Sequence, residues 1–311
     1  MTEKSDTPLF KKLTLIGIGL IGSSIAHACR RANLVDEITI TTRREETLEE
    51  ARRLNLGDHY TLDMTEAVTD ADLVIACIPV GACEAVAKQI GPHLKSGTII
   101  SDVGSVKRSV INQMQPHLPD NVHFIPGHPV AGTEYSGPAS GFASLFDDRW
   151  CILTPLDKSN REALDQLIAF WQRLGSNVDV MDADHHDLVL ATTSHLPHLI
   201  AYNIVGTAAD LEDVTQSEVI KYSASGFRDF TRIASSDPTM WRDVFLHNKE
   251  AVLEMLSRFS EDLSSLQRAI RWDDGDKLYE IFSRTREIRR SIIDAGQDVD
   301  APDFGRKEKD T

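Results

Sequence analysis

The amino-acid sequence predicts an α/β fold in two parts, a doubly wound parallel sheet followed by an all-helical region. Three observations predict it. Gly17-x-Gly19-x-x-Gly22 follows a short apolar strand that begins at Leu13, and a helical pattern comes after it. Strand patterns then alternate with helical patterns as far as residue 181, and from there to about residue 291 the patterns are helical. A length of 311 residues is sufficient for two such domains.

The glycine motif has the context that gives it meaning, with a strand before it and a helix after it. Gly17 allows a tight turn, Gly19 a close approach of the backbone to a pyrophosphate, and Gly22 close packing of the helix on the strand. The helix N-terminus, which includes Leu20 and Ile21, offers free N–H groups to the phosphates. The sequence thus predicts a Rossmann-type dinucleotide site. A glycine-rich turn in some other α/β protein is the alternative.

The other elements of the first part follow from apolar and β-branched runs separated by amphipathic stretches. Residues 72–79 form a nearly continuous apolar run closed by a proline, as in a strand buried on both faces of a parallel sheet. Its end, Ile78 and Pro79, is expected to border the dinucleotide, because ligands bind at the carboxyl edge of such sheets. The remaining predicted strands are 37–42, 98–102, 122–125, 151–154 and 177–181, and the predicted helices are 23–32, 47–56, 82–90, 106–114 and 161–174.

The helical part begins with residues 184–210, which could form one long helix except for Pro197. A proline inside a helix costs about 3 kcal/mol, so a kink is expected there. Further along, apolar residues recur at alternating spacings of four and three, a heptad-like pattern of helix packing. They are Val252, Leu256, Phe259, Leu263, Leu266 and Ile270. This seam fits a dimer interface and an internal core equally well.

The composition is that of an ordinary soluble globular protein, with 41% hydrophobic and 26% charged residues. A net charge of −15 argues against nucleic-acid and membrane partners, since both require a basic surface. The four cysteines show no metal-binding spacing. Most of them are expected to be small buried residues, and the protein is expected to occupy a reducing compartment. Because the sequence contains neither a signal-peptide pattern nor an apolar run long enough to span a membrane, the protein is expected to be cytoplasmic.

The residues after the second strand bear on the choice of nicotinamide nucleotide. In dinucleotide folds an acidic residue at this place binds the ribose 2′-hydroxyl, and here Thr42 is followed by Arg43 and Arg44. Two guanidinium groups would bind a 2′-phosphate that an acidic residue would repel, so NADP is preferred over NAD. The alternative is that the arginines begin a solvated helix and that either nucleotide is accepted.

Two segments after predicted strands carry candidate catalytic groups. Ser105 lies in Asp-Val-Gly-Ser-Val-Lys, where its hydroxyl could point at the nicotinamide or substrate, or could equally cap a helix. His128 and Glu134 lie in a loop rich in glycine and proline, Pro-Gly-His-Pro-Val-Ala-Gly-Thr-Glu. A rigid loop that presents one histidine at the carboxyl edge of the sheet suits a general base.

Two further segments lie in the helical part. His195 and His198 are three residues apart around Pro197 and suit polar contacts to an anionic substrate better than a metal, because no further ligand has a suitable spacing. His185 and His186 could be surface residues at the start of that helix. Three arginines could bind a substrate carboxylate: Arg228, Arg232 and Arg242. The structural alternative is that they form ion pairs with Asp229 or Asp243.

With these segments identified, the chain resembles the prephenate/arogenate (cyclohexadienyl) dehydrogenases of tyrosine biosynthesis. The resemblance runs from about Leu13 to Ile293 and is carried by GIGLIGSS, DVGSVK, GHPVAGTE, TSHLPH and GFRDFTRIASSDPTMWRD, in that order. It implies an oxidative decarboxylation, in which the ring gives a hydride to the nicotinamide, the 4-hydroxyl loses a proton and the ring carboxylate leaves as CO2. Thr42 departs from the pattern, since members that prefer NAD have an acidic residue there.

The resemblance also implies a role for each matching residue. His128 would be the base at the 4-hydroxyl, Ser105 would contact that hydroxyl and the nicotinamide, and Arg232 would bind the ring carboxylate. The remaining expected substrate-site residues are His195, His198, Glu134, Arg228 and Trp241. The family's helical domain forms dimers, which favours the dimer interpretation of the apolar seam.

The expected organisation is therefore an N-terminal tail (1–12), a Rossmann domain (13–182), an all-helical C-terminal dimerisation domain (183–295) and a disordered tail (296–311). The expected partners are a small-molecule substrate and a second copy of the chain. Two rival functions are a β-hydroxyacid-type dehydrogenase and a non-catalytic NADP-sensing dimer. The first would require a lysine base within residues 184–210, where no lysine occurs, and the second has no need of His128 together with Arg232.

Overall fold

The computed structural model describes residues 7–133, 135–210 and 225–294. Glu134, residues 1–6 of the expected N-terminal tail and the whole of the expected C-terminal tail lie outside the described residues. The chain divides into two compact units, residues 1–253 and 254–311, and each is described by itself.

The first unit is built on a six-stranded sheet in which every neighbouring pair of strands is parallel. Its order is β3-β2-β1-β4-β5-β6, which places a topological switch point between β1 and β4. This confirms the predicted doubly wound sheet. The strands are β1 (Phe10–Ile16), β2 (Val35–Thr41), β3 (His59–Thr61), β4 (Leu73–Ala76), β5 (Ile99–Asp102) and β6 (His123–Phe124).

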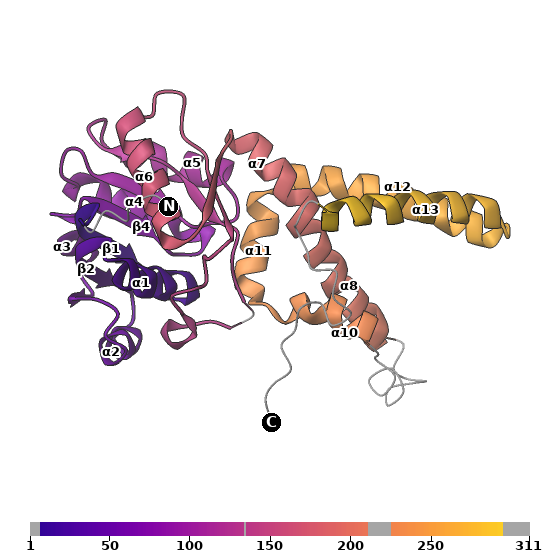
Figure 1. The fold of residues 1–311 in the computed structure, drawn as a ribbon, viewed down its shortest axis with the longest axis horizontal. Coiled ribbons are helices and arrows are strands. Elements are labelled where there is room, and N and C mark those ends of the chain that lie inside the picture. The colour runs from indigo at the N-terminus through magenta and orange to yellow at the C-terminus, as the bar shows by residue number, and fades with distance from the viewer. Residues whose placement is uncertain (1–6, 134, 211–224, 295–311) are drawn as a thin grey trace. The chain divides into compact units, whose positions relative to one another are not determined.

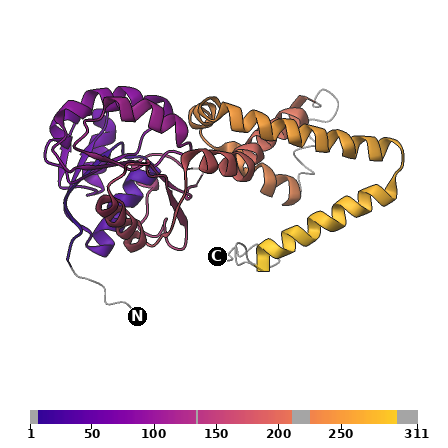
Figure 2. The same cartoon turned by 90° about the horizontal axis from the view of Figure 1, so that it is seen from above.

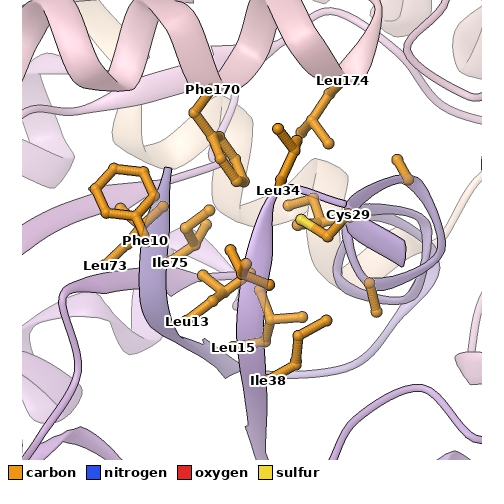
Figure 3. Close-up of a cluster of buried hydrophobic side chains, with 14 of the residues drawn as sticks. Phe10, Leu13, Leu15, Cys29, Leu34, Ile38, Leu73, Ile75, Phe170 and Leu174 are labelled. Atoms are coloured by element: carbon orange, nitrogen blue, oxygen red, sulfur yellow. The ribbon is translucent and has the colours of Figure 1, made fainter. Parts of the chain in front are cut away.

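Helices cover both faces of this sheet (Figure 1), because alternate residues of each strand point to opposite sides. Leu73 and Ile75 of β4 pack into a core with α1 and α6, whereas Val74 and Ala76 pack into a second core with α4 and α5. Figure 3 shows part of the first core, where Phe170 lies over the apolar side chains of β1 and its neighbours. The helices are α1 (Leu20–Ala32), α2 (Glu45–Arg53), α3 (Met64–Val68), α4 (Cys83–Ile90), α5 (Arg108–Met114) and α6 (Arg161–Leu174).

A second, three-stranded sheet corrects the sequence prediction for this region. Residues 151–154 and 177–181 were expected to extend the parallel sheet, and the segment around His128 was expected to be a loop. Instead β7 (Gly127–Pro129) pairs antiparallel with β8 (Trp150–Leu153), and β8 pairs parallel with β9 (Asn177–Val180). His128 is therefore opposite Ile152 in a sheet and not in a free loop.

After β9, the described residues of the first unit are mostly helical, as predicted. Residues 183–210 are continuous helix, but residues 191–195 form a widened π turn immediately before Pro197. Such a turn adjusts the backbone hydrogen bonding where a proline has no N–H to donate. The helices are α7 (Ala183–Leu190), α8 (Leu196–Asp210), α10 (Ser225–Thr231) and α11 (Pro238–His247), with a short 3-10 turn at Arg232–Ser235.

The second unit consists of long helices: most of α12 (Lys249–Arg271), then α13 (Gly275–Asp294) after a short turn (Figure 2). Of the predicted apolar seam on α12, Val252 is buried, whereas Leu263 and Ile270 are 53% and 64% exposed. An internal core thus does not account for the outer part of the seam. Within the described residues, the structure has no helix that is both long enough and apolar enough to cross a membrane.

Candidate active site

The turn between β1 and α1 has the geometry of a dinucleotide cradle. Gly17 has a φ of +92°, and a Cβ there would lie 2.3 Å from the carbonyl oxygen of Cys77. A Cβ on Gly22 would lie 2.5 Å from the carbonyl oxygen of Gly17, so neither position accepts a larger residue without movement of the backbone. A Cβ on Gly19 would meet nothing within 4 Å. The turn therefore leaves space, at the N-terminus of α1, where a pyrophosphate would fit.

The edges of this cradle contain the other predicted nucleotide-binding residues. Ile78, two residues after the end of β4, lies close to Gly17, and Pro79 beside it is exposed. Beyond β2, Thr42 is half-buried and both Arg43 and Arg44 are exposed.

The two arginines beyond β2 differ from their neighbours in their pairing. Within the described part of the chain, neither the Arg43 nor the Arg44 side chain has an ion pair. Arg52 and Arg53 on the adjacent helix α2, in contrast, pair with glutamates of that helix. Two exposed guanidinium groups thus remain available at the end of β2.

A buried ion pair organises the carboxyl end of β5. Lys107 is completely buried, and its Nζ lies 2.5 Å from Oδ2 of Asp102, which is also buried. The ammonium group also donates to the carbonyl oxygen of Gly127 at 2.6 Å, and the Asp102 carboxylate accepts from the N–H groups of Gly104 and Gly127. These bonds fix the loop after β5 to the first residue of β7, and so set the position of the neighbouring His128.

Asp187 on α7 connects the same loop to two histidines. Its carboxylate oxygens accept the backbone N–H groups of Lys107 and Arg108 at 2.7 and 2.9 Å, at the beginning of α5. One of those oxygens also lies 2.8 Å from Nδ1 of His186. Nε2 of His186 in turn lies 2.9 Å from Nδ1 of His128. The result is a buried chain of hydrogen bonds that ends on the histidine singled out as a base.

The environment of His128 keeps its imidazole neutral. Burial, the largest cause, lowers the pKa of His128 well below its usual 6.5, and electrostatic interactions with His186, Lys107 and His195 lower it further. Burial also lowers the pKa of His186, although its hydrogen bond to Asp187 opposes this. At neutral pH His128 is therefore in the form that can accept a proton.

His195 lies in the π turn and is completely buried. The side-chain amide of Asn248 donates to the carbonyl oxygen of Asp187 at 2.8 Å and lies 3.1 Å from Nδ1 of His195. Nδ1 of His195 is thus an acceptor and Nε2 carries the proton. Burial lowers the pKa of His195 to about 4, so this ring is a neutral donor.

His198, on α8, lies close to His195. Its ring stacks on Trp241 of α11 at a centroid distance of 3.7 Å and an interplanar angle of 23°. Its Nδ1 lies 2.8 Å from the carbonyl oxygen of Ser194, to which it donates. Burial lowers the pKa of His198, and a smaller contribution comes from the positive charge of Arg232, which therefore lies close by. His195, His198, Trp241 and Arg232 are thus brought together.

Ser105 lies in the loop after β5, three residues before the first residue of α5, where a helix starting at 106 was predicted. Asp187 binds the N–H groups at the start of α5, so Ser105 does not have the capping role that was its structural alternative. Its backbone adjoins the His195 ring, whose pKa it raises against the effect of burial.

The three arginines near α10 and α11 differ in their surroundings. Arg242 pairs with Asp243 at 2.7 Å, as the structural alternative for it supposed. Arg228 lies on α10 and is exposed. Arg232 is close enough to His198 for its positive charge to lower the pKa of that ring. Glu134 lies outside the described residues.

Comparisons with known proteins agree with this arrangement. Two family models match the chain: prephenate dehydrogenase, nucleotide-binding domain, over residues 25–180, and prephenate dehydrogenase, dimerization domain, over residues 182–284. The chain is 43% identical over 284 residues to the cyclohexadienyl dehydrogenase of Zymomonas mobilis subsp. mobilis, which covers 91% of this chain and 97% of the relative. It is 31% identical over 293 residues to the prephenate dehydrogenase of Bacillus subtilis, covering 94% and 77% respectively. The chain belongs to the prephenate dehydrogenase family.

Solved structures of the family have the same fold. The crystal structure of prephenate dehydrogenase from A. aeolicus in complex with hydroxyphenyl propionate and NAD+ matches with a TM-score of 0.83 at 32% identity, covering 91% of this chain and 98% of that one. The arogenate dehydrogenase of Synechocystis matches with a TM-score of 0.75 at 26% identity, covering 90% and 99%. The resemblance inferred from the five motifs is confirmed, and the protein is an NAD(P)-dependent dehydrogenase of this family.

Sequence reasoning missed several residues that organise the site in this family member. The expectation that His186 is a surface residue was wrong, because its ring is completely buried between His128 and Asp187. The local sequence around it, two histidines near a helix start, gives no sign of a partner 58 residues away. Asp102 and Lys107 did give a sign, since both lie in DVGSVK, one of the five motifs. The others that were missed are Asp187 and Asn248.

Proposed function

We propose that this enzyme catalyses the oxidative decarboxylation of both prephenate and arogenate. The observation that carries the proposal is His128, a buried and neutral imidazole beside the loop at the carboxyl end of β5. A neutral imidazole there can take the proton of a substrate hydroxyl as the ring is oxidised. Both substrates have the same ring, 4-hydroxyl and ring carboxylate, and the groups clustered around His128 suit those shared parts.

The other residues of the cluster support roles in binding. Ser105 would hydrogen-bond the 4-hydroxyl, and the neutral His195 would offer its Nε2–H as a further donor. The guanidinium of Arg232 would bind the ring carboxylate and orient it without holding it so tightly that loss of CO2 is slowed. His198 and Trp241 would pack against the ring as one stacked unit. Glu134 and Arg228 remain proposed members of the substrate site.

The nucleotide would be bound by the β1–α1 turn, with Gly17, Gly19, Gly22, Leu20 and Ile21 around the pyrophosphate and with Ile78 and Pro79 along the edge. When bound, the nicotinamide accepts the hydride that the ring loses. The open space at Gly19 supports this placement, because a side chain there would occupy the position of the phosphates.

The first experiment compares rates of NADH or NADPH formation from prephenate and from arogenate, in the wild type and in His128→Asn. The wild type is expected to oxidise both substrates. The variant should lose about 10²- to 10⁴-fold in kcat, because a positioned base contributes that much, while its affinity for the nucleotide is unchanged. The acid limb of the wild-type kcat profile should lie below pH 6.5, because activity is lost only as the pH falls through the lowered pKa of His128. The absence of turnover with either substrate would contradict the proposed function, and full turnover in the variant would remove His128 from its role.

We also infer a preference for NADP over NAD. It is supported by Arg43 and Arg44, two exposed guanidinium groups without a described ion pair beside Thr42. In Arg43→Ala, kcat/KM for NADP should fall about 10-fold while that for NAD is unchanged, because a charged hydrogen bond to the 2′-phosphate is lost. Arg53→Ala is the matched control, since Arg53 is an exposed arginine that pairs with Glu50 on α2. An equal effect on both nucleotides in Arg43→Ala would contradict the inference.

We further propose that the active protein is a homodimer that associates through its helical part. Residues 13–182 would then bind the nucleotide, and residues 183–295 would complete the substrate site and carry the interface. The support for association is the set of large apolar side chains that α12 and α13 leave exposed within the single chain.

A further inference from the structure

Three side chains behind the active-site cluster form a line of hydrogen bonds that the proposed chemistry does not yet use. Asp187 and His186 are consecutive residues of α7, and His128 lies on β7. Oδ1 of Asp187 is 2.8 Å from His186 Nδ1, and His186 Nε2 is 2.9 Å from His128 Nδ1. His186 has no exposed surface, and Asp187 and His128 are 5% and 7% exposed. Water therefore does not compete for these bonds.

The pattern of donors and acceptors allows one assignment of the protons. The Asp187 carboxylate already accepts two backbone N–H groups at the start of α5, and as an ionised carboxylate it can only accept. His186 must therefore donate from Nδ1, which leaves Nε2 of a neutral His186 as an acceptor. His128 must then donate from Nδ1, so the lone pair of its neutral ring is on Nε2.

We propose that His186 and Asp187 are positioning residues that hold His128 in its Nδ1–H tautomer and so present its Nε2 lone pair to the substrate hydroxyl. This rests on the proposed function of His128 as the base. In the step itself, the 4-hydroxyl proton moves to Nε2 of His128, and the Nδ1–H bond to His186 is kept. The positive charge that develops on His128 is stabilised through His186 by the negative charge of Asp187.

The other charged and titratable groups around His128 do not offer an alternative anchor for its ring. Lys107 is held by Asp102 and by the carbonyl oxygen of Gly127, and its charge opposes protonation of His128. His195 is held by Asn248. His186, in contrast, is hydrogen-bonded directly to the His128 ring, so its removal would leave Nδ1 of His128 without this acceptor.

The first test is the ¹⁵N NMR spectrum of histidine-labelled wild-type enzyme, with the signals of His128 assigned by comparison with His128→Asn. The resting enzyme should show a protonated Nδ1 and an unprotonated Nε2 for His128 at neutral pH. A ring protonated at Nε2 would overturn the proposal. This measurement needs no turnover, so its failure is distinct from a failure of the proposed function.

The second test compares two substitutions at His186 by steady-state kinetics. His186→Leu removes the acceptor, and kcat should fall about 100-fold with KM for the substrate unchanged, because the wrong tautomer of His128 becomes populated. In His186→Gln a side-chain oxygen can accept from His128 Nδ1, so most of kcat should be restored. His185→Gln is the matched control, since His185 is the exposed neighbour on the same helix, and it should match the wild type.

Two outcomes of the kinetics would overturn the proposal. One is a wild-type kcat in a folded His186→Leu enzyme. The other is a loss in His186→Gln as large as in His186→Leu, which would mean that the ring fills space and does not act as an acceptor. If His186→Leu does not fold, the NMR spectrum of the wild type and the kinetics of His186→Gln still decide.

Discussion

At the scale of single residues, two buried charges connect the segments that form the site. The ammonium of Lys107 and the carboxylate of Asp102 have essentially no exposed surface, and each has hydrogen bonds beyond their mutual one. A buried pair satisfied in this way does not need to add net stability, but removing one partner leaves an uncompensated charge. The pair therefore locks the loop that carries Ser105 to the strand that carries His128.

The substitution Lys107→Met tests the cost of leaving one charge of this pair buried without its partner. The variant should lose about 3–5 kcal/mol in free energy of unfolding, because Asp102 is left buried without its counter-charge. The control is Lys95→Met, since Lys95 lies 2.6 Å from Asp72 in a pair whose side chains are 40% and 29% exposed. There the loss should be about 1 kcal/mol or less. Urea denaturation of both variants measures the difference, and equal losses would show that burial does not set the cost.

At the scale of elements, the beginning of α5 is determined by a residue far along the chain. The N-cap of α5 is Lys107, whose side chain does not cap the helix, and the N–H groups of Lys107 and Arg108 are bound by Asp187 instead. Because Asp187 belongs to α7, the packing of α7 on α5 fixes both the loop with Ser105 and the histidine at position 186. One carboxylate thus places two parts of the site.

The same long-range contact explains which elements the sequence could predict. The glycine turn and the strands of the parallel sheet other than β3 were predicted well, because each has a local signal: a β-branched or apolar run, or three glycines at fixed spacing. Strand β7 was missed because Gly-His-Pro has little intrinsic preference for a strand, and its pairing with β8 is what makes it one. The three-residue strand β3 was missed for lack of length.

The residues of the candidate site also differ in whether the local sequence indicates their role. Ser105, His128, His195, His198 and Arg232 lie in motifs whose residue types already suggested chemistry. The expected kink at Pro197 is accompanied by a π turn that brings in His195, which residue spacing alone does not reveal. The supporting residues His186, Asp187 and Asn248 carry no local signal, since their roles come from contacts across 53 to 80 residues of chain.

At the scale of the whole molecule, the exposed apolar side chains of the second unit call for an explanation. Ile270, Trp272 and Tyr279 are 64%, 73% and 76% exposed, and Phe282 on α13 is 55% exposed. A single chain that leaves so many large apolar residues in water favours association, which removes them from water at about 25 cal/mol per Å² of apolar surface. A match to a dimerization domain over residues 182–284 points the same way.

Dimerisation can be tested by placing a charge on this surface. Leu263→Glu, at a seam position that is 53% exposed, should shift the protein from dimer to monomer in sedimentation velocity at micromolar concentration, because association would bury an unpaired carboxylate. Its melting temperature should also lose the concentration dependence expected of a dimer. Leu62→Glu is the matched control: Leu62 is 48% exposed, lies next to β3 and is remote in sequence from the helical part, so the dimer should persist. A wild-type protein that sediments as a monomer, or a Leu263→Glu variant that remains a dimer, would place the interface elsewhere or remove it.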